Sequence, residues 1–306
     1  MYARTMVVAM LLSVCACLTA KAHQTAAGSS AQPIRVAQAN GGDQIVMAPV
    51  SDAAGRTTLM QVRVCRPAAD APARLVVINH GSPPDPANRP GMQPGRCDQE
   101  AAQWFLRRGY VVAFPLRRGY GATGGDWAER YGPCDLADYY HAGLETARDI
   151  NAAIDFLTTL PFVRPDGVVV VGQSAGGWGT IAYDSVAHPK VIAFIVMAGG
   201  RGGHQQDRPN NNCHPERLAE ATGHYGQTAT TPMLWSYVKN DSFFNPKLAA
   251  VMHQYFVQAG GKAEFYTPES FDSDGHHLFF GHNGSDLWGP VVEKYLSQQV
   301  PADAAQ

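Results

Sequence analysis

One serine of this chain stands in a pattern that can do covalent chemistry. Ser174 is the middle residue of Gly-Gln-Ser-Ala-Gly, and four consecutive valines precede the motif. The pattern is typical of a sharp turn from a buried strand into a helix, which exposes a serine hydroxyl at its tip. Gly172 and Gly176 suit that turn because strand and helix approach too closely there for side chains. The spacing predicts a nucleophile; the alternative is a glycine-rich turn that merely contains a serine.

A serine hydroxyl is a weak nucleophile at neutral pH, so it needs a base and a group that orients the base. Asp241 follows the predicted strand 233–238, and His276 follows the last predicted strand, 263–267. The carboxyl ends of parallel strands meet at one edge of a sheet, where both side chains can approach Ser174. We therefore predict Ser174 as the nucleophile, His276 as the base and Asp241 as the acid that orients it.

Two adjacent histidines compete for the role of base. His276 directly follows Gly275, and a glycine lets the loop turn sharply enough to aim the next side chain at the nucleophile. Neighbouring side chains in a loop diverge, so we expect His277 to point elsewhere and to pack or hydrogen-bond beside the following apolar residues.

A short motif, His-Gly-Ser, follows the predicted strand 74–79 and suits the stabilisation of an oxyanion. In serine hydrolases with such a turn, the loop after this strand gives one backbone N–H and the residue after the nucleophile gives the other. We assign these donors to Ser82 and Ala175. His80 is expected to pin the loop by hydrogen bonds rather than to act as the base, because bases come late in this chain order.

Strands and helices alternate along most of the chain, which predicts a mainly parallel, doubly wound α/β sheet flanked by helices. Apolar residues spaced three and four apart predict the helices. The first two strands are expected to pair as a hairpin at the sheet edge, and Asp98 to cap the first helix. The predicted strands are 44–49, 58–65, 74–79, 110–114, 168–171, 191–197, 233–238 and 263–267, and the predicted helices are 98–108, 136–160, 178–186, 215–221, 246–259 and 290–298.

Two loops are candidates for contact with a substrate. The glycine-rich stretch 117–125 predicts a mobile rim in which Arg117 and Arg118 are solvated or weakly paired, the alternative being a site for an acidic substrate group. Tyr120 in this stretch, and Trp178 just after the elbow, are the candidate substrate-binding residues. Residues 199–231 lose apolar periodicity between two core strands, and so long a stretch predicts a lid over the site within a single domain, 44–300.

The first residues are typical of an export signal. Arg4 precedes an apolar run and Ala20-Lys21-Ala22, which predicts a signal peptide 1–22 and a flexible leader 23–43. A lipid anchor on Cys17 is the less favoured alternative, and the run is too short for a comfortable membrane span. Cleavage would move the formal charge from −2 to −4, so no basic face for nucleic acid is predicted. We expect a periplasmic or secreted protein without an integral membrane segment.

Four cysteines remain after the predicted signal, and an even number in an oxidising compartment favours two disulfides. Cys97 and Cys134 each lie just beyond the carboxyl end of a predicted strand, which favours their pairing. Cys65 with Cys213 then follows by elimination.

No metal or other cofactor is predicted. The chain has no C-x-x-C pair of the kind that holds structural zinc. A cluster of acidic and histidine side chains near the last strand lacks a fixed helical spacing, so it does not favour a metal site. Its members are Asp272, Asp274, His276, His277 and His282.

From about residue 75 to 296 the chain resembles α/β-hydrolases of the dienelactone-hydrolase and prolyl-oligopeptidase-like group. The order Ser174, Asp241, His276 is that of α/β-hydrolases. The stretch 117–125 is similar to the R-G-Y-G-x-S-x-G motif of the group, with Thr123 where serine is commoner. The resemblance implies a serine acyl-hydrolase. Dienelactone hydrolases themselves use a cysteine nucleophile, which makes dienelactone an unfavoured substrate.

These observations predict hydrolysis of a small-molecule carboxylic ester through an acyl-enzyme, without a cofactor. A peptidase is the runner-up, because the peptidases of the group carry a large N-terminal propeller for which residues before 44 leave no room. A binding protein that kept the fold and lost the chemistry is the third hypothesis. It is unfavoured because no triad residue or elbow glycine is missing.

Overall fold

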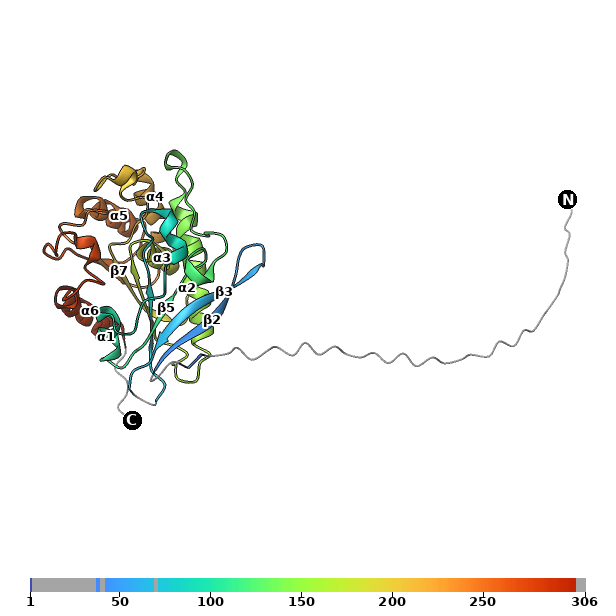
Figure 1. Ribbon diagram of the computed structural model, residues 1–306. Helices are drawn as coiled ribbons and strands as arrows, with labels where there is room; N and C mark the ends of the chain where they lie inside the picture. The colour runs from blue at the N-terminus through green and yellow to red at the C-terminus, as the bar shows by residue number, and fades with distance from the viewer. Residues whose placement is uncertain (2–36, 39–41, 69–70, 301–306) are drawn as a thin grey trace, which may run out of the picture. The chain divides into compact units, whose positions relative to one another are not determined.

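The computed structural model describes Met1 and residues 37–38, 42–68 and 71–300. In this part of the chain one sheet has the strand order β1-β2-β3-β5-β4-β6-β7-β8-β9 (Figure 1). The strands are β1 (Ala37–Gln38), β2 (Asp43–Ser51), β3 (Thr57–Cys65), β4 (Leu75–Asn79), β5 (Val111–Pro115), β6 (Val168–Gln173), β7 (Val191–Met197), β8 (Met233–Ser236) and β9 (Ala263–Tyr266).

The sheet has an antiparallel edge and a parallel body. β1 pairs antiparallel with β2, β2 with β3, and β3 with β5, whereas β5, β4, β6, β7, β8 and β9 pair parallel in that order. The chain order reverses around β4, which lies between β5 and β6. Ligands of doubly wound sheets bind at the carboxyl ends of the strands where the order reverses. The motifs predicted to do chemistry follow β4 and β6 at this place.

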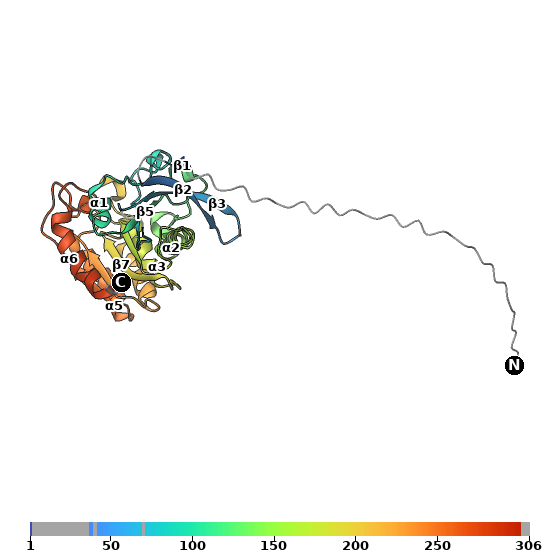
Figure 2. The same ribbon diagram turned by 90° about the horizontal axis from the view of Figure 1, so that it is seen from below.

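Six α-helices cover the two faces of the sheet in the described residues. They are α1 (Glu100–Leu106), α2 (Tyr139–Leu157), α3 (Ala175–Asp184), α4 (Pro215–Gly226), α5 (Pro246–Gln258) and α6 (Ser285–Gln299). Figure 2 shows α1 and α6 on one side of the sheet and α2 and α3 on the other.

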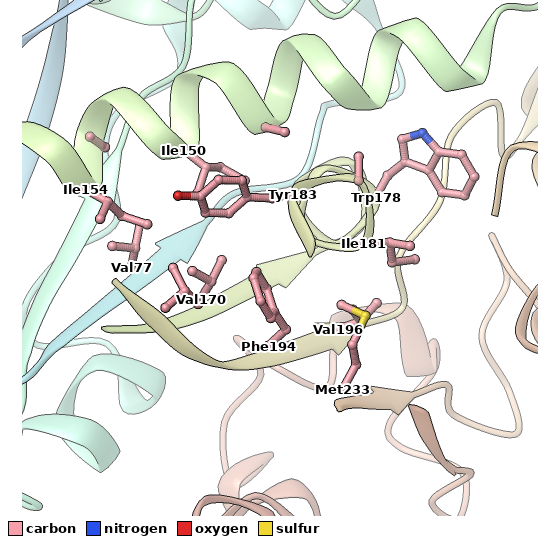
Figure 3. Close-up of a cluster of buried hydrophobic side chains, with 14 of the residues drawn as sticks. Val77, Ile150, Ile154, Val170, Trp178, Ile181, Tyr183, Phe194, Val196 and Met233 are labelled. Atoms are coloured by element: carbon pink, nitrogen blue, oxygen red, sulfur yellow. The ribbon is translucent and has the colours of Figure 1, made fainter. Parts of the chain in front are cut away.

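Alternate residues of the central strands enter two separate cores, as the period of two in a strand requires. Val77 and Val170 pack with α2 and α3, and Figure 3 shows both with Ile150 and Ile154 of α2. Their neighbours along the strands face the core formed with α1 and α6. Because both faces are covered, all residues of β4 and β6 are buried, which explains the apolar runs 75–78 and 168–171 within them.

The predicted alternation of strands and helices is confirmed, with corrections at the element ends. Asp98 does not cap α1: the helix begins after Gln99, and Asp98 instead binds Arg96 at 2.8 Å. The last helix begins at Ser285, so Pro290 lies inside it rather than at its start. α4 extends to Gly226, beyond the short helix that was predicted.

The N-terminal predictions fall mostly outside the described residues, as the signal peptide 1–22 does. The leader 23–43 is corrected at its end, because Ala37 and Gln38 pair with Ile45 and Gln44 of β2. Within the described residues, none of the helices has the length and apolar character that crossing a membrane requires.

The predicted disulfide pairing is wrong, although all four cysteines are paired. Cys65 bonds to Cys97, and Cys134 bonds to Cys213. Cys65 lies opposite Val112, near the start of β5, because β3 runs antiparallel to it. The segment 80–99 returns along the sheet from the end of β4, so Cys97 reaches Cys65 instead of staying near the carboxyl ends of the strands.

Candidate active site

Ser174 occupies the turn between β6 and α3, with a φ of 54° and a ψ of −120°. Residues other than glycine seldom adopt this geometry, and they keep it only where the surroundings hold it. A Cβ on Gly172 would lie 2.3 Å from the carbonyl oxygen of Gly176, and a Cβ on Gly176 would lie 2.3 Å from that of Asn79. Both positions therefore need glycine, as the sequence predicted, and the tight packing fixes the serine at the tip.

His276 and Asp241 form a buried pair at the carboxyl ends of the strands. The Nδ1 atom of His276 lies 3.2 Å from each carboxylate oxygen of Asp241. One of these oxygens also accepts the backbone N–H groups of Phe243 and Phe244, each at 2.8 Å. Because Nδ1 faces a carboxylate, it carries the proton, and Nε2 is left as the acceptor.

The loop that carries His276 is tied to the nucleophile turn and to the acid loop. The carbonyl oxygen of His276 accepts a hydrogen bond from Gln173, the residue before the nucleophile, at 3.1 Å. Asp274 accepts the N–H of His276 at 3.0 Å and the hydroxyl of Ser242 at 2.6 Å. Burial alone would raise the pKa of Asp274, but these hydrogen bonds outweigh burial and lower it.

The two histidines diverge as the sequence predicted, but His277 is not packed beside the apolar residues that follow it. His276 is 6% exposed, and its ring stacks on Phe243 at 4.2 Å, whereas His277 is exposed. Phe243 is itself sandwiched, because the ring of His204 stacks on it at 3.6 Å. The aromatic stack limits the orientations that the His276 imidazole can adopt.

The loop after β4 lies against the nucleophile. A Cβ on Gly81 would stand 3.1 Å from the Cβ of Ser174, and Ser82 lines the same cavity as Ser174 and Ala175. The structure thus brings the two residues predicted to give oxyanion donors to the nucleophile. That Ser82 and Ala175 donate hydrogen bonds to an oxyanion is part of the proposed function below.

His80 holds this loop by its backbone and its ring. Its Nδ1 lies 2.7 Å from the carbonyl oxygen of Gly81, and its Nε2 accepts the N–H of Arg117 at 3.3 Å. Only the neutral imidazole with its proton on Nδ1 makes both bonds. Burial, with the positive charge of Arg117, lowers the pKa of His80 to about 3.

A cavity of about 290 Å³ opens beside the nucleophile. Its wall combines small, aromatic and cationic side chains from loops at the carboxyl ends of the strands. The lining residues are Ser82, Pro83, Pro84, Pro86, Arg89, Trp127, Tyr131, Gly132, Ser174, Ala175, Gly200, Arg201, Gly202, Gly203, Phe243 and Phe244. The segment 199–231, predicted as a lid, contributes Gly200 to Gly203, while its helix α4 packs on α2 and α5.

Arg117 and Arg118 are buried, contrary to the solvated rim that the sequence predicted. Arg117 is fully buried and pairs with Glu129. Arg118 pairs with Asp149 at 2.6 Å and with Glu145 at 2.8 Å. Burial raises the pKa of Asp149 to about 6, although Arg118 opposes the shift.

Glu129 is the centre of an ion cluster beneath the cavity. It accepts hydrogen bonds from Arg117, Arg201 and the hydroxyl of Tyr120, and it is fully buried. Burial alone would raise the pKa of Glu129, but the two guanidinium groups outweigh burial and hold it well below its ordinary value. The carboxylate is therefore ionised at neutral pH.

Tyr120 and Trp178 do not line the cavity, so their predicted contact with substrate is corrected. Both are fully buried. Tyr120 binds Glu129 at 3.0 Å, and the indole N–H of Trp178 donates to the carbonyl oxygen of Tyr139 at 2.8 Å. Trp178 packs in the core with α2 and α3, whereas Tyr120 belongs to the buried polar group around Glu129.

Several residues of the site were missed by sequence reasoning. Phe243 directly follows the acid loop, and Asp274 stands in the same short motif as His276, so proximity to a predicted triad residue could have found both. Arg201 and Glu129 stand in no motif that singles them out, and they lie 72 residues apart in the chain. In the described residues, no group of three or more His, Cys, Asp or Glu side chains is arranged to hold a metal ion.

Part of the chain is similar in sequence to known proteins. Residues 97–200 match the prolyl oligopeptidase family, a stretch that contains Ser174 but neither Asp241 nor His276. Dipeptidyl-peptidase 5 of Porphyromonas gingivalis is 32% identical over 101 residues, which cover 32% of this chain and 14% of that protein.

Solved structures extend the likeness to most of the chain. The acylaminoacyl peptidase of Pyrococcus horikoshii superposes with a TM-score of 0.60 at 15% identity, over 87% of this chain and 43% of that one. Est1E from Butyrivibrio proteoclasticus has a TM-score of 0.54 at 12% identity, over 85% of this chain and 99% of that one. This chain thus spans less than half the length of the two peptidases.

The sheet order and the likeness to these solved structures show the fold, whereas the family match is limited to residues 97–200. The chain therefore has the α/β-hydrolase fold. Its relatives by sequence and structure include both peptidases and esterases.

Proposed function

We propose that the protein hydrolyses a carboxylic ester through an acyl-enzyme on Ser174. One observation carries the proposal: an elbow serine lines a cavity while Gln173, the residue before it, anchors the buried His276–Asp241 pair. The substrate is a small-molecule ester, and the reaction needs no cofactor.

Each residue has a distinct part in the proposed reaction. Nε2 of His276 takes the proton of the Ser174 hydroxyl as its oxygen attacks the ester carbonyl, and the backbone amides of Ser82 and Ala175 stabilise the oxyanion. Collapse of this intermediate breaks the ester bond, and His276 returns the proton to the leaving alcohol. Asp241 keeps the imidazole oriented and stabilises its charged form. Water then attacks the acyl-enzyme by the same steps and releases the acid.

A peptidase is the second candidate, and the match to the prolyl oligopeptidase family favours it. The two activities differ in the leaving group, so one acyl group should be tested on both. The experiment compares 4-nitrophenyl butanoate with butanoyl 4-nitroanilide and divides each enzymatic rate by the uncatalysed rate, because esters react faster without any enzyme.

The expected result is a larger rate enhancement for the ester, which falls by a factor of about 10⁴ to 10⁶ in a folded Ser174→Ala variant. A larger enhancement for the anilide favours the peptidase. Ester turnover by Ser174→Ala at the wild-type rate would exclude the proposed nucleophile.

We further propose that the protein is exported to the periplasm or secreted. The N-terminal pattern supports this, and the two disulfides are compatible with an oxidising compartment. N-terminal sequencing of the mature protein should begin at His23, after cleavage at Ala22. A mature protein that starts at Met1 would contradict export by this signal.

A further inference from the structure

The cavity beside Ser174 is lined by two charged side chains in the described part of the chain, and both are arginines. Arg89 follows the oxyanion loop, and Arg201 follows β7. Among the described residues that form this wall, none is Asp or Glu. A substrate in this cavity therefore meets positive charge close to the nucleophile.

Arg201 is buried without being fully paired. It is 3% exposed and donates to Glu129 and to the hydroxyl of Thr146, yet its Nε has no hydrogen-bond partner. Burying an unpaired donor is unfavourable. Arg201 also shares Glu129 with Arg117, so this cluster of two cations and one anion keeps an excess of positive charge.

Arg89 adds a second positive charge on the same wall. Its guanidinium carbon lies 3.5 Å from the centre of the Trp127 ring, and that of Arg201 lies 6.0 Å from the same ring. The Nε of Arg89 likewise has no hydrogen-bond partner. Burial lowers the pKa of Arg89, and the charge of Arg201 acts in the same direction.

We propose that Arg89 and Arg201 bind a carboxylate of the substrate, so that the protein cleaves esters that carry a free carboxyl group. This inference rests on the proposed function and names its substrate class. A guanidinium presents planar, paired donors that match a carboxylate, and such charge-assisted bonds are strong where water is scarce. The carboxylate balances the excess positive charge that the two arginines place beside the nucleophile.

Two matched pairs of esters test the preference on either side of the scissile bond. The acyl side compares 4-nitrophenyl hydrogen adipate with its methyl ester, and the alcohol side compares 4-acetoxybenzoate with its methyl ester. We expect kcat/KM to be at least tenfold higher for the acid in one of the pairs. Equal or lower values for the acid in both pairs would overturn the inference.

Arginine variants show whether the two side chains cause the preference. Arg89→Gln is the main variant because Arg89 stands outside the Glu129 cluster, and it should lower the acid-to-ester ratio of kcat/KM by about tenfold. Arg96→Gln is the control, since Arg96 is exposed, pairs with Asp98 and does not line the cavity. An equal ratio in the two variants would contradict the inference. Arg201→Lys, checked for folding by thermal unfolding, should also lower the ratio.

A binding measurement separates this inference from the proposed reaction. Calorimetry on folded Ser174→Ala should detect monomethyl adipate, with binding weakened by the additional change Arg89→Gln and not by Arg96→Gln. Binding with no ester turnover by the wild type would refute the proposed function and support the carboxylate site. Turnover of neutral esters without binding of monomethyl adipate would support the proposed function and refute the carboxylate site. Tighter binding of inorganic phosphate than of monomethyl adipate would overturn the choice of carboxylate.

Discussion

The Ser174 turn and the Glu129 cluster lie under the same cavity but are held by different forces. The turn depends on close approach of uncharged backbone, since a Cβ at Gly172 or Gly176 would collide with carbonyl oxygens. The cluster depends on charges from separate segments, because Glu129 meets Arg117 and Arg201 where all three side chains are buried. Changes of triad side chains should therefore abolish activity and spare stability, whereas changes in the cluster should first cost stability.

The largest effect is expected at the base. His276→Ala should lower ester turnover by about 10⁴-fold or more because no other group can take the serine proton. His277→Ala should keep turnover within about tenfold, a barrier change of about 1.4 kcal/mol, since its side chain is exposed. Both variants should unfold at nearly the wild-type denaturant midpoint. A dead His277→Ala protein beside an active His276→Ala protein would refute the assignment.

The cluster gives the next largest effect, and it concerns stability. Glu129→Gln keeps the side-chain shape but leaves two buried guanidinium groups without their counter-charge, so the free energy of unfolding should fall by about 3–5 kcal/mol. Glu145→Gln is the matched control, because Arg118 keeps Asp149 and Glu145 is partly exposed. Its loss should stay near 1 kcal/mol or below. Equal losses of unfolding free energy in the two variants, measured by urea unfolding, would contradict a larger contribution of the Glu129 cluster to stability.

The two disulfides test the same comparison, because they join different segments of the chain. Replacing either pair by alanines should cost about 2–4 kcal/mol, and more for Cys134–Cys213, which closes the longer loop. Only removal of Cys134–Cys213 should also lower kcat/KM. This disulfide holds Cys213 in place, and the N–H of Cys213 donates to the carbonyl oxygen of the cavity residue Gly202 at 2.8 Å. Loss of activity on removing Cys65–Cys97 alone would contradict this division.

The effect that is smallest over a single pH unit is a pH dependence of stability from His80. Its pKa is lowered to about 3 by burial and Arg117, so the folded protein binds fewer protons than the unfolded chain below the ordinary histidine range. The stability it contributes is present above about pH 6.5 and is lost as the pH falls toward 3, by at most about 1.4 kcal/mol per pH unit. Urea unfolding between pH 7 and 4 should show a shallower decline in His80→Gln. Parallel declines in both proteins would exclude His80 as a source.

The sequence predicts features that depend on neighbouring residues and fails where distant segments decide. The elbow, the position of His276 beside Asp241 and the strand alternation follow from local glycines and apolar periods. The prediction of the cysteine pairing failed because the pairing depends on the path of residues 80–99. The prediction that Arg117 is solvated failed because its partner Glu129 has no local signature. Tyr120 and Trp178 stand in suitable motifs, but depth below the surface is a property of the packed fold.

The central claim is that Ser174 is a nucleophile activated by His276. The most direct measurement is labelling with a fluorophosphonate probe, followed by intact mass and peptide mapping. We expect one adduct per chain, on Ser174, with none in Ser174→Ala and slow labelling in His276→Ala. A folded wild-type protein that does not react, or that carries the adduct on another residue, would contradict the account.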